Sequence, residues 1–153
     1  VIRRTGDSLV CALDEQNFYF SNNVFVMLPR KVNKLSLKYV LGLLNSPLMT
    51  WYQLTIQPRR GRVFAEVKIN QINDYPLRTI DFDDSVDKAR HDRMVELVDL
   101  MLELHKKLPK AKTEHEKNLL QRQIDATDKQ INNLVYELYG LTEEEIKIVE
   151  EGT

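Results

Sequence analysis

The second half of the chain carries apolar residues at alternating intervals of three and four. Such spacing places side chains along one stripe of an α-helix, and two such stripes can pack together as a seam. Pro109 interrupts the pattern, because proline breaks a helix interior. We therefore expect a helical hairpin with coiled-coil-like seams over residues 85–139. The seam residues are Met94, Leu97, Met101, Leu104 and Leu108 in the first arm, and Leu120, Ile124, Thr127, Ile131, Leu134 and Leu138 in the second.

Start and stop signals bound the second arm and predict one more helix. Thr113 and Glu116 have the spacing of a capping box, and Gly140 favours the left-handed conformation that ends a helix. Thr142 and Glu145 repeat the capping-box spacing. A short helix is therefore expected after residue 142.

The first half has a different pattern, typical of strands and short helices. Ser36 is a good N-cap, and Pro47 suits the first position of a second helix. Residues 9–13 are a short apolar run, and the aromatic and β-branched runs at residues 17–20 and 24–28 are typical of strands. Residues 63–67 could form one more strand. We expect an α+β fold: a small mixed domain over residues 1–80, then the long helical hairpin and the short final helix over residues 81–153.

Charge is distributed very unevenly along the chain. Residues 1–78 carry 11 Lys and Arg against 5 Asp and Glu, a net charge of +6. Residues 79–153 carry 11 against 18, a net charge of −7. A sign change of this size suggests two functional parts, and the basic part is a candidate for binding a polyanion.

Two groups of basic residues are the strongest candidates for that contact. One group surrounds Gly61, which would let the backbone approach a groove closely. Arginine presents a planar fork that binds phosphate or the O6 and N7 atoms of guanine. The candidates are Arg59, Arg60 and Arg62 in this group, Arg30, Lys31, Lys34 and Lys38 in the other, and Lys68 further along.

Apart from one weak motif at residues 66–68, the sequence lacks motifs for catalysis, cofactor binding and metal binding. The five glycines are scattered, so no phosphate-cradling loop is expected. Cys11 is the only cysteine, which fits a buried thiol in a reducing cytoplasm and excludes a disulfide within the chain. The three histidines, expected to be solvated or at the edge of a seam, are His91, His105 and His115.

Two further expectations concern the chain as a whole. No apolar run approaches the roughly 18 residues of a membrane-spanning helix, so we expect no membrane segment. The chain begins with Val1 and not with methionine, which suggests a fragment of a longer polypeptide.

One weak motif keeps an enzymatic alternative open. Glu66 and Lys68 match the acid-x-lysine half of a nuclease site, in which a carboxylate binds a divalent ion and the lysine assists the attacking water. Such a site also needs a second acid on a neighbouring strand, and Asp14 is the only plausible one. The same residues would otherwise form an exposed strand edge.

Three segments, in this order, resemble a known family. Residues 40–48, which read VLGLLNSPL, resemble the leucine-leucine-asparagine-serine segment of target-recognition domains in restriction–modification enzymes. Residues 69–80, with Tyr75-Pro76-Leu77, resemble the proline-containing segment that follows it, although the second proline common there is missing. Residues 131–146 look like the C-terminus of the TaqI-like specificity domain. The resemblance spans roughly residues 20–150.

This resemblance implies a function for the basic half. Members of the family read a DNA sequence for an adenine-specific DNA methyltransferase, in some cases a type II restriction enzyme that also cleaves DNA. Double-stranded DNA and an upstream methyltransferase domain are then the expected partners. S-adenosylmethionine would bind in that upstream domain, because this chain has no adjacent prolines and so lacks the Asn-Pro-Pro-Tyr motif.

Under this interpretation the helical hairpin acts as a spacer and docking surface. The family's base-contacting residues vary with the target, so none is carried over by position. A helical assembly module that self-associates without binding DNA stays open as an alternative.

Overall fold

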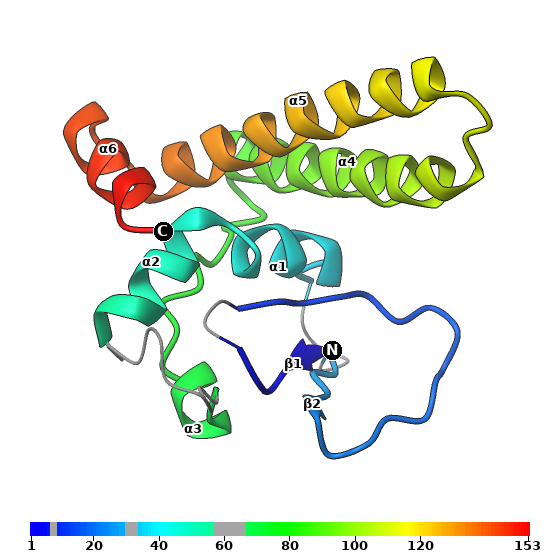
Figure 1. The fold of residues 1–153 in the computed structure, drawn as a ribbon. Coiled ribbons are helices and arrows are strands. Elements are labelled where there is room, and N and C mark those ends of the chain that lie inside the picture. The colour runs from blue at the N-terminus through cyan, green and yellow to red at the C-terminus, as the bar shows by residue number, and fades with distance from the viewer. Residues whose placement is uncertain (7–8, 30–33, 57–66) are drawn as a thin grey trace.

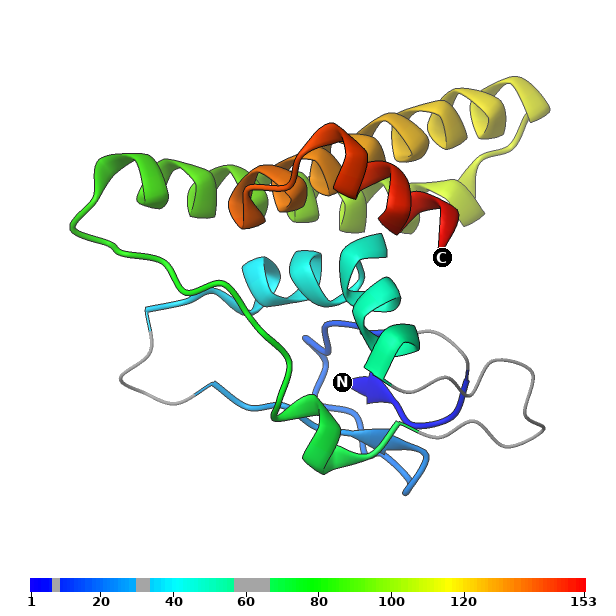
Figure 2. The ribbon, with the colours of Figure 1, turned by 90° about the vertical axis from the view of Figure 1, so that its left-hand side faces the viewer.

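The structure, a computed structural model, describes residues 1–6, 9–29, 34–56 and 67–153. The elements lie in three layers (Figure 1; Figure 2). The first layer is the helical hairpin with the final helix, the second is a pair of short helices, and the third holds the strands and a single-turn helix. In chain order, the elements are β1 (Ile2–Arg3), β2 (Val24–Phe25), α1 (Leu37–Leu44), α2 (Pro47–Ile56), α3 (Ile69–Ile72), α4 (Ser85–Lys107), the 3-10 turn η1 (Leu108–Lys110), α5 (Glu114–Tyr139) and α6 (Glu143–Glu151).

The hairpin and its boundaries confirm the sequence prediction. The Thr113 hydroxyl accepts a hydrogen bond from the amide of Glu116, whose side chain accepts one from the amide of Thr113 in return. Gly140 adopts φ 66°, the left-handed conformation that ends α5. Thr142 and Glu145 form the same reciprocal cap at the start of α6. Coiled-coil geometry within the hairpin stays a prediction.

A sharp corner joins α1 to α2. Ser36 caps α1 by accepting a hydrogen bond from the amide of Lys38 at 3.2 Å. The buried Ser46 hydroxyl donates to the carbonyl of Leu43 and accepts from the amide of Met49, so it closes α1 and opens α2. Pro47 occupies the first position of α2, where its missing N–H leaves no lost bond. The expected break and restart are both confirmed.

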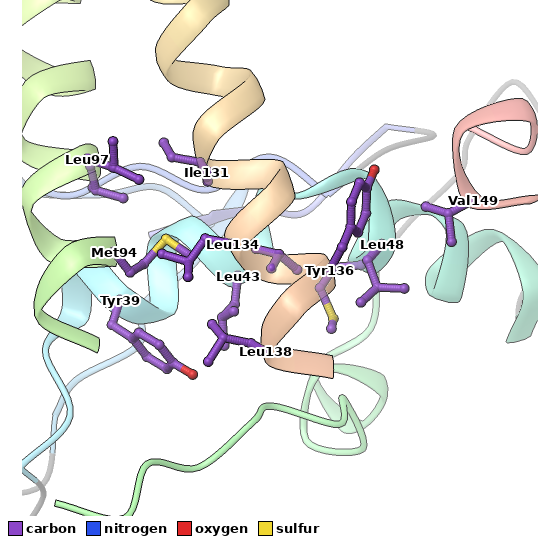
Figure 3. Close-up of a cluster of buried hydrophobic side chains, with 13 residues drawn as sticks. Tyr39, Leu43, Leu48, Met94, Leu97, Ile131, Leu134, Tyr136, Leu138 and Val149 are labelled. Atoms are coloured by element: carbon purple, nitrogen blue, oxygen red, sulfur yellow. The ribbon is translucent and has the colours of Figure 1, made fainter. Parts of the chain in front are cut away.

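The larger core joins both halves of the chain (Figure 3). Met94 and Leu97 on α4 and Ile131 and Leu134 on α5 pack with side chains from α1, α2 and α6. The layers approach closely at Gly42 of α1, where a Cβ atom would lie 2.6 Å from the sulfur of Met94. The division at residue 80 stays a prediction about organisation, but α1 and α2 pack on the hairpin in one continuous core. The remaining members of this core are Tyr39, Leu43, Leu48, Met49, Val98, Val135, Tyr136, Leu138 and Val149.

The strands are shorter than expected. β1 and β2 pair antiparallel, with Ile2 opposite Phe25 and Arg3 opposite Val24, and Ile2 also forms an isolated bridge to Cys11. The strand expected at residues 17–20 is wrong. Its rings point to solvent, with Phe18 61% and Tyr19 105% exposed. Of the possible strand at 63–67, all but Val67 lies outside the described residues.

The third layer has its own small core. Leu77 packs against this core and also against the larger one, so the segment that leads to α4 touches both. The buried members of the small core are Ile2, Leu9, Leu44, Val67 and Tyr75. The basic half therefore has a small core of its own and also packs against the hairpin through the larger core.

Candidate nucleic-acid interface

The structure describes three of the eight basic residues predicted to contact a polyanion. Lys34, Lys38 and Lys68 are described. The other five lie outside the described residues: Arg30, Lys31, Arg59, Arg60 and Arg62. The surroundings of the predicted basic residues are therefore known at Lys34, Lys38 and Lys68.

Lys68 lies at one end of the small sheet, close to two basic residues that the prediction did not select. The amide of Val67 donates to the carbonyl of Arg4 at 2.8 Å, and the amide of Arg4 donates to the carbonyl of Asn23 at 2.9 Å. This backbone ladder places Arg4 next to the residue that precedes Lys68. Arg3, the neighbour of Arg4 on β1, is exposed, and so is Lys68. Arg3 and Arg4 were visible to sequence analysis only as part of the +6 charge.

The same ladder holds Val67, the first described residue after the three clustered arginines. Val67 directly follows residues 57–66, and its side chain is buried in the small core. The position of Val67 is therefore set by Arg4 and by the small core, next to the exposed Lys68.

Lys38 is engaged by the hairpin. Its ammonium lies 2.5 Å from a carboxylate oxygen of Asp99 on α4, and its side chain is only 28% exposed. The first turn of α1 is thereby tied to the hairpin, and part of the Lys38 charge is neutralised within the chain. A lysine in this setting offers less to an external anion than an exposed one does.

Lys34 is exposed and packs at the edge of an aromatic cluster. Its ammonium lies 5.8 Å from the ring centre of Phe82, within the range of a cation–π contact. Phe82 meets the ring of His91 edge-on at 5.1 Å, and His91 lies 5.2 Å from the ring of Tyr39. His105 and His115 are exposed, as expected for solvated histidines, whereas His91 is buried and therefore not solvated.

Arg78, also counted in the basic half, is held by α4. Its guanidinium lies 3.0 and 3.2 Å from the two carboxylate oxygens of Asp87, which is buried. Hydroxyls of Tyr39 and Tyr139 fix its backbone from two sides: Tyr39 donates to its carbonyl at 3.0 Å, and its amide donates to Tyr139 at 3.1 Å. The positive charge of Arg78 is therefore paired within the chain by Asp87.

The residues of the nuclease alternative are only partly described. Glu66 lies outside the described residues. Asp14, the expected partner acid, uses one carboxylate oxygen to accept from the amide of Gln16 and the other to accept from the amide of Phe18, each at 2.9 Å. This carboxylate shapes the turn that exposes Phe18 and Tyr19, and Asn17 within that turn adopts φ 57°. In the described part of the chain, His, Cys, Asp and Glu form no cluster suited to a metal ion.

The motif residues behind the family resemblance have structural roles. The Asn45 side chain accepts from the amide of Cys11 at 2.8 Å and donates to its carbonyl at 3.0 Å, so it fastens the segment after β1 to the α1–α2 corner. Tyr139 donates to the carbonyl of Pro76 at 2.7 Å.

Burial raises the pKa of the Cys11 thiol to about 11, which keeps it protonated and unreactive at neutral pH.

Among the described residues, no helix is both long and apolar enough to cross a membrane.

The family model of the TaqI-like C-terminal specificity domain matches residues 1–77, half of the 153-residue chain. No curated protein and no solved structure matches the chain. The matched range includes the segment around Asn45 and Ser46 and ends at Leu77. Residues 131–146, which also resemble the family's C-terminus, lie outside it.

Proposed function

Because the chain belongs to the family of TaqI-like C-terminal specificity domains, we propose that it recognises a double-stranded DNA sequence for a restriction–modification methyltransferase. Catalysis would take place in an upstream domain that binds S-adenosylmethionine and methylates adenine. The observation that carries the proposal is the family match over residues 1–77, the part of the chain with the positive net charge.

We assign the exposed basic residues near the end of β1 to the DNA backbone. Phosphate contacts from lysine and arginine fix the register of a protein on the duplex without reading its sequence. Arg3 and Lys68 are exposed near Arg4 and suit this role. Lys34 is exposed as well, whereas Lys38 is engaged by Asp99 and would contribute less. Arg30 and Lys31, which precede Lys34 in the sequence, are assigned to the same backbone contacts.

We assign base reading to the arginines around Gly61. Arginine can bind the O6 and N7 atoms of guanine with two parallel hydrogen bonds, and this pair discriminates against other bases by about 1–3 kcal/mol. Arg59, Arg60 and Arg62 precede Val67 in the sequence, and Val67 is bonded to Arg4 near the assigned phosphate contacts, which supports this assignment. At least one of the three is expected to read a guanine.

The acidic hairpin would face protein or solvent, because its negative charge would be repelled by phosphate. Its carboxylates already hold Lys38 and Arg78 of the basic half. A spacer that fixes the recognition half fits this arrangement. Docking of the hairpin on the upstream domain and self-association through its helices stay proposals.

Titration of a labelled DNA duplex at several salt concentrations tests the backbone assignment. Removal of one phosphate contact reduces the slope of log affinity against log salt by about 1. We expect Lys68→Ala and Arg3→Ala to have this effect, and Lys38→Ala to have a smaller one. Arg122→Ala, at an exposed position on α5, is the matched control and should leave the slope unchanged. Equal slopes for all four variants and the unsubstituted chain would contradict the assignment.

A further inference from the structure

His91 makes a contact between the hairpin and the basic half that its sequence position does not suggest. The residue is 6% exposed, and its Nε2 atom accepts a hydrogen bond from the backbone amide of Ser36 at 3.2 Å. The two residues are 55 positions apart. Ser36 is the N-cap of α1, and Lys34 lies two residues before it.

The hydrogen bonds fix the tautomer of this histidine. The Ser36 amide can only donate, so Nε2 must carry a lone pair. The proton then sits on Nδ1, which lies 3.0 Å from a carboxylate oxygen of Asp92 and donates to it. Both ring nitrogens are therefore used, and Nε2 offers an acceptor to the start of α1.

The ring of His91 also supports Lys34 through Phe82. Phe82 contacts His91 edge-on, and the ammonium of Lys34 lies over the Phe82 ring. Tyr39 packs on the ring from α1. His91 thus holds the segment of Lys34 twice, through the backbone of Ser36 and through the aromatic ring under the lysine.

We propose that His91 is a positioning residue for DNA binding, which acts by holding Ser36 and Phe82 so that Lys34 is presented to a phosphate. This inference rests on the proposed function, because it assigns DNA as the ligand of Lys34. His91 itself does not touch the DNA. Its contribution depends on an acceptor at Nε2 and on Lys34 being present.

Two substitutions separate the acceptor from the rest of the side chain. His91→Gln places an amide oxygen that can accept from the Ser36 amide, whereas His91→Leu fills space without an acceptor. The affinity of the folded protein for a labelled duplex of mixed sequence is measured for both, with the folded fraction determined by circular dichroism. We expect His91→Leu to weaken binding about threefold, at the low end of couplings between contacting residues. His91→Gln keeps the acceptor but loses the ring contact with Phe82, so it should weaken binding less than His91→Leu does. His105→Leu, at an exposed histidine of the same helix, is the control and should retain the affinity of the unsubstituted chain.

A double substitution tests whether His91 acts through Lys34. Lys34→Ala alone should weaken binding and lower the salt slope, and His91→Leu should add no further loss in the Lys34→Ala background. Independent losses that multiply would overturn the proposal, and so would equal losses for Gln and Leu at position 91. Reduced stability of His91→Leu with unchanged affinity and salt slope would make His91 purely structural. If the unsubstituted chain bound no duplex at any salt concentration, the proposed function itself would fail, and this inference with it.

Discussion

One nitrogen of the Arg78 guanidinium, Nη2, donates to both carboxylate oxygens of Asp87, at 3.0 and 3.2 Å. Arg78 belongs to the segment that leaves the basic half, and Asp87 lies in the first turn of α4. Asp87 also accepts a hydrogen bond from the amide of Asp81 at 3.2 Å. One carboxylate therefore holds the connecting segment at both Arg78 and Asp81, just before α4. The pair therefore joins the two oppositely charged halves of the chain.

Asp87→Ala should destabilise the protein measurably. Removing one member of a buried ion pair costs about 3–5 kcal/mol, but an exposed pair contributes at most about 1 kcal/mol. Asp87 is buried and Arg78 is 39% exposed, so we expect a loss of about 2 kcal/mol in the free energy of unfolding. Urea denaturation measures this loss. Asp83→Ala, at an exposed site in the same connection, should be close to neutral, and an equal loss for both variants would contradict the role of Asp87.

Leu134→Ala tests the seam of the hairpin. Leu134 of α5 is buried in the larger core with residues of α4 and α1, so its truncation leaves a cavity. The expected loss of unfolding free energy is about 2–5 kcal/mol, the range for leucine in a well-packed core. Asn133→Ala, at the exposed neighbouring position, is the control. A loss below about 0.5 kcal/mol at Leu134 would show that the seam is not packed as described.

Local signals in the sequence predicted the helix boundaries well. The capping box of Thr113 and the left-handed Gly140 depend only on residues within a few positions. The local sequence is therefore enough to predict where α5 begins and ends. The same holds for Ser46 and Pro47 at the corner between α1 and α2.

Contacts between distant segments could not be predicted in the same way. The burial of His91 depends on Ser36 and Phe82, and the pairing of Lys38 with Asp99 depends on how α1 lies on α4. The exposed rings of residues 18 and 19 follow from the turn that Asp14 caps, whereas their residue types favour a strand. Charge counting found the basic half but could not separate Arg78, held within the chain, from the exposed Lys68.

Glu145 gives a pH-dependent contribution to stability. The backbone amide of Thr142 donates to its carboxylate at 2.8 Å, and this bond lowers the pKa of Glu145 below the usual value of 4.5. A lowered pKa in the folded state means stability that is present above pH 4.5 and is lost as the pH falls through the folded-state pKa. Glu145→Gln keeps an acceptor but cannot titrate. Its deficit against the unsubstituted chain should therefore be largest near neutral pH and disappear in acid.

Thermal unfolding at about pH 7 and at about pH 3 measures this difference. Glu144→Gln, at the exposed neighbouring position, controls for general charge effects at the start of α6. A deficit of Glu145→Gln that stays constant across this pH range would exclude the proposed linkage.

The chain is expected to have no catalytic activity on DNA by itself. It lacks a glycine-rich cofactor loop and the Asn-Pro-Pro-Tyr motif of an adenine methyltransferase. Both carboxylate oxygens of Asp14 accept hydrogen bonds from backbone amides of its own turn. Incubation with DNA, Mg²⁺ and S-adenosylmethionine should give neither methylation nor cleavage. Metal-dependent cleavage that Glu66→Ala abolishes would establish the nuclease alternative in place of our account.

Selection of bound duplexes from a pool of randomised sequence tests the central claim most directly. The unsubstituted chain should enrich one short sequence, and at least one of Arg59→Ala, Arg60→Ala and Arg62→Ala should relax the preference for guanine at a single position, at a cost of about 1–3 kcal/mol. Arg122→Ala on α5 should select the same sequence as the unsubstituted chain. Selection without enrichment of any sequence, or identical preferences for all three arginine variants and the unsubstituted chain, would contradict DNA sequence reading by the arginines around Gly61.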